Sequence, residues 1–195
     1  MGVEDKKRKK KDRLIQAGTG LFSERGFGLT TVSDITRRAG VAKGTFYLYF
    51  QDKQHLLAEI LNCLALQHEE NYRQLRTVPS AVERLKKYAA GELRFYQDNM
   101  DLARFTVTGI GSEVQSFINW YLETQKRHID FLEETIDEGC RQGSFEVEDA
   151  AKAARFLQGA IFMFLACQVF KSDHLLDINA NADFIIRTFL EGVGK

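Results

Sequence analysis

A single proline, Pro79, occurs in this chain of 195 residues. Because proline removes a backbone donor and interrupts helix interiors, its scarcity leaves long stretches free to form helices. Apolar residues recur at steps of three and four through most of the chain, without a strong run of the apolar–polar alternation typical of half-buried strands. The hydrophobic share of 44% is enough to build a core. The sequence therefore predicts an all-α fold of about nine helices.

Turn-forming residues predict where these helices begin and end. The first helix should end near Arg25, where glycines follow, and Thr31 can cap a short second helix that Gly40 ends. A third helix is expected over residues 43–50, and Asp52 can cap a long fourth helix. Later helices are predicted to begin after the proline and to cover residues 114–140, 149–169 and 178–190.

The charges are unevenly distributed along the chain. Lysine and arginine together number 27, as do aspartate and glutamate, so the formal net charge is zero. Residues 1–53 nevertheless hold 12 basic and 6 acidic side chains, and the remainder is acidic. A basic N-terminal quarter suits contact with a polyanion such as nucleic acid.

Within this basic quarter, two short helices joined by a tight turn at residues 40–42 form a helix-turn-helix. The apolar residues that would pack the two helices together are Ile35, Ala39, Val41, Phe46 and Phe50. The opposite face of the second helix then points outward. It carries Lys43, Gly44, Thr45, Tyr47 and Tyr49. A cation, hydroxyl groups and a glycine that permits close backbone approach suit contact with phosphates and base edges.

The run Gly-Val-Ala-Lys-Gly-Thr-Phe-Tyr-Leu-Tyr-Phe at residues 40–50, followed by Asp52 and Lys53, resembles the DNA-binding signature of the TetR family (TetR/AcrR-like) of bacterial transcriptional regulators. The resemblance implies that the five outward residues contact DNA and that Lys53 binds a phosphate at the start of the fourth helix. It further implies that the second helix reaches flanking phosphates or a base through Thr31, Ser33 and Arg37. The implied domains are a DNA-binding domain over residues 1–52 and a ligand-binding and dimerisation domain over residues 53–195.

The same resemblance implies a small-molecule effector, bound among the fourth to eighth helices. An apolar or aromatic effector would suit six aromatic side chains of this region: Phe95, Phe105, Phe117, Trp120, Tyr121 and Phe162. Three basic residues, Arg94, Arg104 and His128, could meet an anionic head group, although a place at the surface is the simpler expectation for each.

The two C-terminal helices are predicted to form a homodimer. The segment 149–169 is apolar on nearly every side, and Ile185, Ile186 and Phe189 form a stripe on the last helix. The resemblance implies a four-helix interface there. Two recognition helices would then enter successive major grooves about 34 Å apart, which predicts a palindromic operator. A repressor of this kind is released when its effector prefers a conformer with a shifted fourth helix.

Other classes of protein find less support in the sequence. The histidines at 55, 68, 128 and 174 are not at ligand spacing, so no metal site and no cofactor are expected, and no pair of residues suggests catalysis. A DNA-binding or architectural protein with a filled, ligand-blind C-terminal core remains an alternative; an enzyme is a weaker one.

The sequence also predicts a cytoplasmic protein that does not contact a membrane. The cysteines at 63, 140 and 167 are far apart and odd in number, as expected for reduced thiols. The charged N-terminus lacks the apolar stretch of a signal peptide. The most apolar stretch, residues 156–170, is shorter than the span of about 20 residues that crosses a bilayer. It is therefore expected to be a deeply buried helix.

Overall fold

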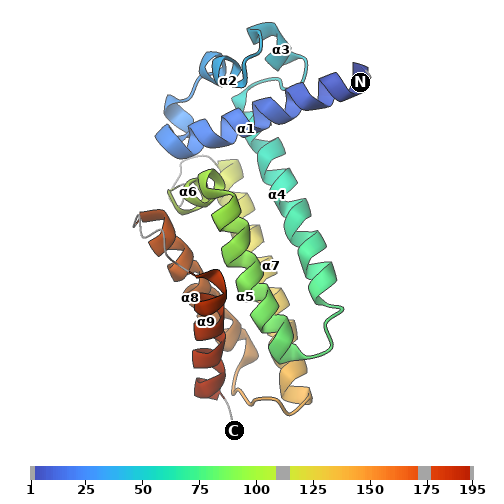
Figure 1. Ribbon diagram of the computed structural model, residues 1–195, viewed down its shortest axis with the longest axis vertical. Helices are drawn as coiled ribbons and strands as arrows, with labels where there is room; N and C mark the ends of the chain where they lie inside the picture. Colours follow the sequence, from blue (N-terminus) through green and yellow to red (C-terminus); the bar gives the residue numbers. More distant parts are fainter. Residues whose placement is uncertain (1–2, 109–114, 171–176, 194–195) are drawn as a thin grey trace. The chain divides into compact units, whose positions relative to one another are not determined.

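The computed structural model describes residues 3–108, 115–170 and 177–193. Within these ranges the chain is all-helical, as predicted, and has no strand (Figure 1). The helices in chain order are α1 (Val3–Leu29), α2 (Val32–Ala39), α3 (Lys43–Tyr47), α4 (Lys53–Leu75), α5 (Ala81–Asp98), α6 (Met100–Thr108), α7 (Gln115–Arg141), α8 (Ala150–Phe170) and α9 (Ile178–Val193).

The helix boundaries of the N-terminal region follow from the predicted caps. Helix α1 is interrupted at Gly26, whose φ of 81° is a left-handed value that glycine adopts at little cost. Thr31 caps α2, and Gly40 ends it with a φ of 62°. Helix α3 is shorter than the predicted 43–50 because the amide of Leu48 bonds to the carbonyl of Thr45, three residues back, in a tightened final turn.

The chain divides into two compact units. The first unit comprises residues 1–66 and 104–120, and the second comprises residues 67–103 and 121–195. Helix α4 belongs to both, since its residues 53–66 lie in the first unit and 67–75 in the second. The domain boundary expected after residue 52 stays a prediction.

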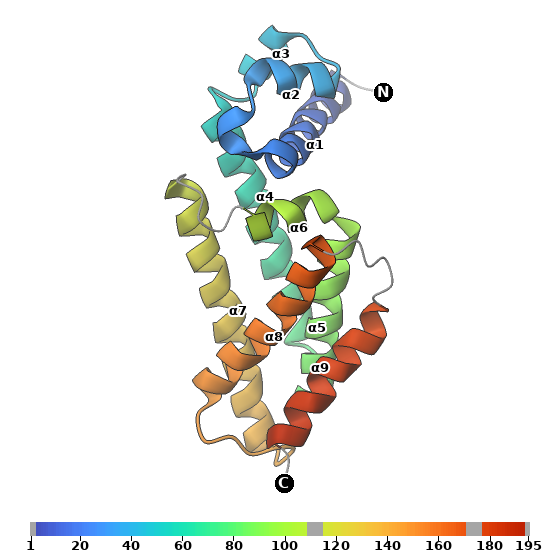
Figure 2. The same cartoon turned by 90° about the vertical axis from the view of Figure 1, so that its left-hand side faces the viewer.

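The first unit packs α2 against α1 and α3 around a core of fully buried side chains (Figure 2). This core includes Leu14, Phe22, Ile35, Phe46 and Phe50. Helix α1 approaches α4 closely at Gly18, where an added Cβ would lie 2.7 Å from Cδ2 of Leu56. Four of the five predicted helix-turn-helix core residues are buried, and the fifth, Val41, is half-buried.

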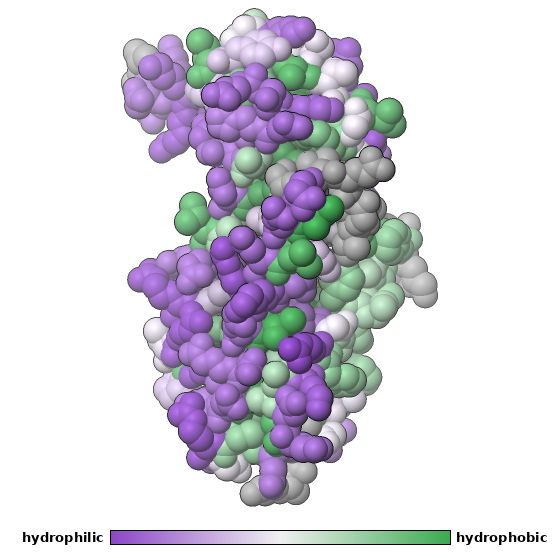
Figure 3. Space-filling model, turned by 180° about the vertical axis from the view of Figure 1, so that it is seen from behind, coloured by the Kyte–Doolittle hydropathy of each residue, from purple (hydrophilic) through white to green (hydrophobic). Residues whose placement is uncertain are grey.

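The second unit packs α5 against α8 and α9, with α8 also against α9 (Figure 2). Its core holds a group of aromatic rings, in which the ring of Phe131 stacks on Tyr72 and Tyr88 with centroids 4.9 and 5.4 Å apart. On the face drawn in Figure 3, hydrophilic side chains predominate and apolar side chains form smaller groups between them.

The apolar stripe of α9 is buried within its own chain, contrary to its predicted role at a dimer surface. Ile185, Ile186 and Phe189 are at most 4% exposed and belong to the core of the second unit. The stripe faces inward because α9 packs on α5 and α8. The final helix therefore covers the core of its own subunit with these three side chains.

Helix α8 has one buried face and one exposed face, so the prediction of a deeply buried helix is only half right. Its inner face includes Ala154, Leu157 and Ile161. Its outer face carries Phe156, Met163 and Phe170, which are 68%, 59% and 69% exposed. By length and composition alone α8 could cross a membrane. One face of the helix nevertheless packs in the helical core of the second unit.

Candidate functional site

Three of the five residues predicted to face outward at the second helix of the helix-turn-helix are exposed. Phe46 is buried and holds the helix on the core, while Lys43 and Gly44 are exposed and Tyr47 is 54% exposed. Thr45 and Tyr49 are half-buried. A cation, an accessible backbone and a phenol therefore lie together on one short helix that is anchored from behind.

Helix α2 is held by a capping box and by ion pairs around its first turn. The hydroxyl of Thr31 accepts a hydrogen bond from the amide of Asp34, and the amide of Thr31 donates back to that carboxylate. Asp34 also pairs with Arg25 at 2.6 Å and with Arg37 at 2.5 Å. The hydrogen bond from Thr31, with help from both guanidinium groups, lowers the pKa of Asp34 below its ordinary value.

Three of the nine predicted DNA contacts therefore lie on α2 or its cap, with distinct local roles. Ser33 is exposed, Thr31 serves as the N-cap, and Arg37 is exposed while bound to Asp34. At the other end of the helix, a guanidinium nitrogen of Arg13 donates to the carbonyls of Ala39 and Gly40. These bonds fix the turn between α2 and α3.

Lys53 has an internal role that the sequence did not predict. Its ammonium group donates to the carbonyl oxygens of Phe27, Gly28 and Thr30 at 2.7, 3.3 and 3.0 Å, and lies 4.3 Å from the centre of the Phe27 ring. The first residue of α4 is thus bound to the segment that precedes α2. A phosphate contact by Lys53 stays a prediction.

The lysine-rich start of the chain is part of helix α1. Nζ of Lys11 pairs with Glu59 at 2.5 Å, and the hydroxyl of Tyr49 donates to the carbonyl oxygen of Lys7 at 3.1 Å. Tyr49 therefore ties the basic end of α1 to the segment after α3. The sequence did not single out Leu48, which is 79% exposed; its position between two outward tyrosines was the available signal.

The six aromatic residues predicted to bind an effector do not form one group. Phe117 and Trp120 are buried in the first unit, with ring centroids 5.7 Å apart. Phe95, Tyr121 and Phe162 belong to the second unit and are half-buried. Phe105 lies in α6, and its side chain is outside the described part of the structure. Which of these residues line an effector site stays a prediction.

The basic residues considered for an anionic head group differ in their exposure. Arg94 and Arg104 are exposed, as expected, and Arg94 donates to the side chain of Asn179. His128 is only 1% exposed, so its expected place at the surface is wrong. The ring is buried because α7 directs it into the core of the second unit, where Tyr72 and Tyr88 contact it.

His128 belongs to a buried polar cluster that the sequence did not predict. The cluster consists of His68, Tyr72, Tyr88, Glu92, His128 and Gln158. Both tyrosine hydroxyls lie 2.7 Å from Nδ1 of His128, and Tyr88 also donates to Oε1 of Gln158 at 2.9 Å. The residues come from α4, α5, α7 and α8, which explains why no local spacing revealed them.

Burial sets the charge states in this polar cluster. Desolvation lowers the pKa of His128 to about 4, despite the opposing effect of Glu92, so its ring is neutral at pH 7. Burial acts to raise the pKa of Glu92, but interaction with His128 and a hydrogen bond from His68 act in the opposite direction, and the pKa falls below its usual value. The Glu92 side chain is only 3% exposed.

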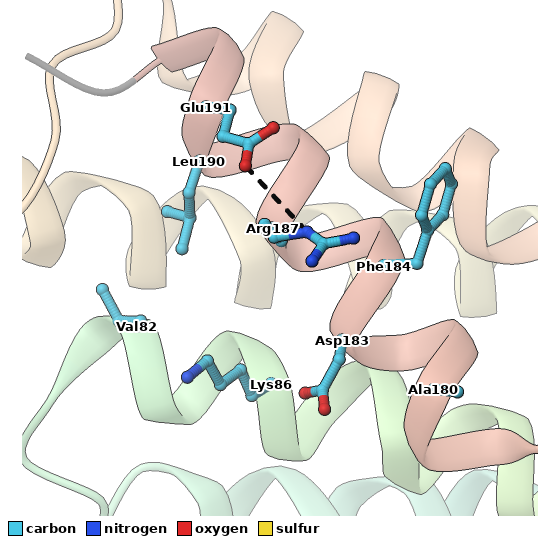
Figure 4. A pocket seen from close by; sticks show the side chains of 8 residues that line it. All are labelled: Val82, Lys86, Ala180, Asp183, Phe184, Arg187, Leu190 and Glu191. Atoms are coloured by element: carbon cyan, nitrogen blue, oxygen red, sulfur yellow. Dashed lines mark ion pairs between the residues drawn. The ribbon is translucent and has the colours of Figure 1, made fainter.

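Two pockets lie in the second unit. An open pocket of about 890 Å³ between α5 and α9 is lined by Val82, Lys86, Ala180, Asp183, Phe184, Arg187, Leu190 and Glu191 (Figure 4). Its lining mixes apolar and charged side chains, with Arg187 and Glu191 3.9 Å apart. A smaller pocket of about 300 Å³ is lined by residues of α4 and α5, including His68, Glu92 and Phe95.

Comparison with known proteins identifies the N-terminal module. The family model of bacterial regulatory proteins of the tetR family matches residues 14–60. The uncharacterized HTH-type transcriptional regulator YerO of Bacillus subtilis is 27% identical over 91% of this chain, and the match spans 62% of YerO. The fatty acid metabolism regulator protein of Bacillus subtilis is 26% identical over 96% of this chain and 97% of its own length.

A solved structure has the same fold over nearly the whole length of this chain. The crystal structure of the transcriptional regulator FadR from Bacillus subtilis, in complex with stearoyl-CoA, matches with a TM-score of 0.80 over 93% of this chain and 98% of FadR, at 23% identity. Residues 14–60, which include the capped helix-turn-helix, therefore form a DNA-binding domain of the TetR family of bacterial transcriptional regulators.

Proposed function

We propose that this protein is a homodimeric repressor in the cytoplasm that leaves a palindromic operator when a small, largely apolar molecule binds its C-terminal domain. The observation that carries the proposal is the outward face of α3, where Lys43, Gly44 and Tyr47 are exposed on a helix anchored by buried Phe46. No catalytic step is required for this function.

Different residues of this face suit two kinds of DNA contact, namely hydrogen bonds or apolar contacts to the bases and contacts to the phosphates. Lys43 supplies a charge for phosphate or for a guanine edge, and the phenol of Tyr47 can bond a phosphate oxygen. Leu48, which is 79% exposed, suits an apolar contact with a thymine methyl group. Gly44 permits the backbone to approach the duplex.

The dimer is supported by the outer face of α8. Phe156, Met163 and Phe170 are spaced seven residues apart, which places them on one side of the helix. Phe184 on α9 is also 50% exposed. Large exposed apolar side chains in such a row favour contact with a second copy. The dimer therefore uses the two predicted helices, through different residues of α9 from those the sequence suggested.

Helix α4 can couple effector binding in the C-terminal domain to the position of the helix-turn-helix. Its first residue, Lys53, is bound to the segment before α2, and its later turns carry His68 and Tyr72 of the buried polar cluster. A displacement of this one helix changes the position of the helix-turn-helix. An effector that binds more tightly to the displaced state weakens the operator complex by that difference in affinity.

The relatives suggest a chemical class for the effector. A fatty acid metabolism regulator matches nearly the whole chain, and the FadR structure holds stearoyl-CoA. We therefore infer an acyl thioester with a long apolar chain as the effector of this protein. The aromatic side chains Phe95, Tyr121 and Phe162 are available in the second unit for such a chain.

The test uses an operator obtained by selecting bound duplexes from a random DNA library. Stearoyl-CoA is then titrated into the preformed complex while fluorescence anisotropy reports the bound fraction. We expect release by stearoyl-CoA at concentrations at which free coenzyme A has no effect. Unchanged operator binding at saturating stearoyl-CoA would exclude this effector class, and selection without an enriched sequence would favour an architectural DNA-binding protein.

A further inference from the structure

The buried carboxylate of Glu92 has neighbours at distances that fit poorly with direct hydrogen bonds. Oε1 lies 3.4 Å from Nδ1 of His68, and Oε2 lies 3.9 Å from Nδ1 of His128. A well-formed N–H···O bond is about 2.7–3.2 Å long. The carboxylate therefore lies between two imidazole rings, and both contacts are longer than a well-formed hydrogen bond.

All three side chains of this group are nearly inaccessible to solvent: His68 is 5%, Glu92 is 3% and His128 is 1% exposed. In the part of the chain that the structure describes, no lysine or arginine forms an ion pair with Glu92. Ionisable groups withdrawn from water in this way favour a cation bound among them.

The separations match those of ligands that share one metal ion. A nitrogen from each histidine and an oxygen of Glu92 all lie within 4.8 Å of one another. Ligand atoms about 2.0–2.2 Å from a tetrahedral zinc ion are separated by about 3.3–3.6 Å. The shortest gap, 3.4 Å between His68 and Glu92, already has this length.

We propose that His68, Glu92 and His128 bind a divalent first-row transition metal ion of the zinc class. Two imidazoles and one carboxylate are a ligand set that such ions accept, whereas magnesium and calcium prefer oxygen ligands alone. The three ligands come from α4, α5 and α7, so the bound ion joins three helices of the second unit.

Neighbouring side chains hold the proposed ligands in place. Tyr72 and Tyr88 contact Nδ1 of His128, and Tyr88 continues the chain of hydrogen bonds to Gln158. One ring nitrogen, Nε2 of His68, is buried without a hydrogen-bond partner among the described residues.

The smaller pocket gives the site a route to solvent. His68 and Glu92 line this pocket of about 300 Å³, together with Asn71 and Arg94. Three protein ligands leave a fourth position of a tetrahedral ion for water or another small molecule. An ion can therefore enter from the pocket and retain one exchangeable ligand there.

The test measures metal binding by the full-length protein after treatment with a chelator. Zinc is titrated by calorimetry, and cobalt(II) is titrated in parallel because its visible absorption reports four- or five-coordinate nitrogen and oxygen ligands. We expect one ion per chain and a cobalt spectrum of low coordination number. Glu92→Gln and His128→Gln should each weaken zinc binding by at least about tenfold, since even loss of an outer hydrogen bond costs about 10–100-fold.

Glu69→Gln and His55→Gln are matched controls, because each removes an exposed side chain of the same type. Both should bind zinc as the unmodified protein does. Circular dichroism checks that each variant is folded. The cobalt spectrum is recorded on the unmodified protein, so this readout does not depend on the folding of any variant. The absence of stoichiometric zinc binding, an octahedral cobalt spectrum, or equal loss in the controls would overturn the proposal. None of these readouts involves DNA, so they are independent of the proposed function.

Discussion

Nζ of Lys53 lies 2.7 Å from the carbonyl oxygen of Phe27 and 4.3 Å from the centre of the Phe27 ring. The same ammonium group reaches the carbonyl of Thr30, one residue before the cap of α2. The start of α4 is therefore bound directly to the segment that leads into the helix-turn-helix. In the proposed mechanism, a movement of α4 acts on α2 and α3 through this contact.

Lys53→Met should weaken operator binding by disturbing the structure rather than by removing a phosphate contact. The substitution keeps an apolar chain near Phe27 but loses three hydrogen bonds. We expect a lower melting temperature and lower affinity, with an unchanged slope of log K against log salt. A slope reduced by about one would instead show that Lys53 binds a phosphate in the complex.

Lys43→Ala should give the opposite pattern. Because Lys43 is exposed and α3 is held by Phe46, the variant should keep its melting temperature. If Lys43 contacts a phosphate, the salt slope should fall by about one; if it contacts a base, specificity at one position should relax at a cost of about 1–3 kcal/mol. Anisotropy titrations at several salt concentrations measure both. Unchanged affinity and specificity would contradict the proposed DNA interface.

Acid should weaken the cap of α2. The lowered pKa of Asp34 means that its contribution to stability is present above the ordinary aspartate pKa of about 4 and is lost as the pH falls through the lower folded value. Asp34→Asn should therefore lower the melting temperature at pH 7. The difference from the unmodified protein should shrink below about pH 4. A difference that stays constant across this range would contradict the role of the carboxylate.

A charge on the outer face of α8 should dissociate the proposed dimer. Met163 is 59% exposed and lies between Phe156 and Phe170 on that face, so Met163→Glu would place a carboxylate at the centre of the interface. We expect a monomer by light scattering and weaker operator binding. Leu122→Glu is the control, since Leu122 is 61% exposed on α7. Dissociation by both substitutions, or by neither, would place the interface elsewhere.

Gly139 permits a close contact that an alanine should break. An added Cβ would lie 2.1 Å from Cζ of Phe145, whose ring is 1% exposed in the core. Gly139→Ala should cost about 1–3 kcal/mol of unfolding free energy, as overpacking typically does. Gly91→Ala is the control, since its added Cβ would lie 3.8 Å from Nδ2 of Asn71, and it should gain up to about 1 kcal/mol. Denaturant unfolding compares the two, and equal effects would contradict the steric explanation.

The parts of the fold that depend on local chemistry were predictable from sequence. Thr31 and Gly40 bound α2 as expected, because a hydroxyl cap and a left-handed glycine act within a few residues. The outward and inward faces of α3 were also predicted, since Phe46 and Lys43 differ in polarity and helical phase.

Features that depend on packing between distant segments could not be predicted from local sequence patterns. Ile185 and Ile186 have the apolar pattern of an interface, but the pattern does not distinguish a partner subunit from the subunit's own core. His68, Glu92 and His128 meet because three helices pack together, and their spacing in the chain carries no sign of it. The internal contacts of Lys53 likewise require the folded position of Phe27.

The central claim is sequence-specific DNA binding through the outward face of α3. Its most direct test is fluorescence anisotropy of the protein on DNA from upstream of its own gene and on a shuffled duplex, at two salt concentrations. We expect tighter binding to the upstream DNA that persists at the higher salt concentration, because base contacts add to phosphate attraction. Equal and equally salt-sensitive binding to both duplexes would contradict recognition of an operator in that DNA.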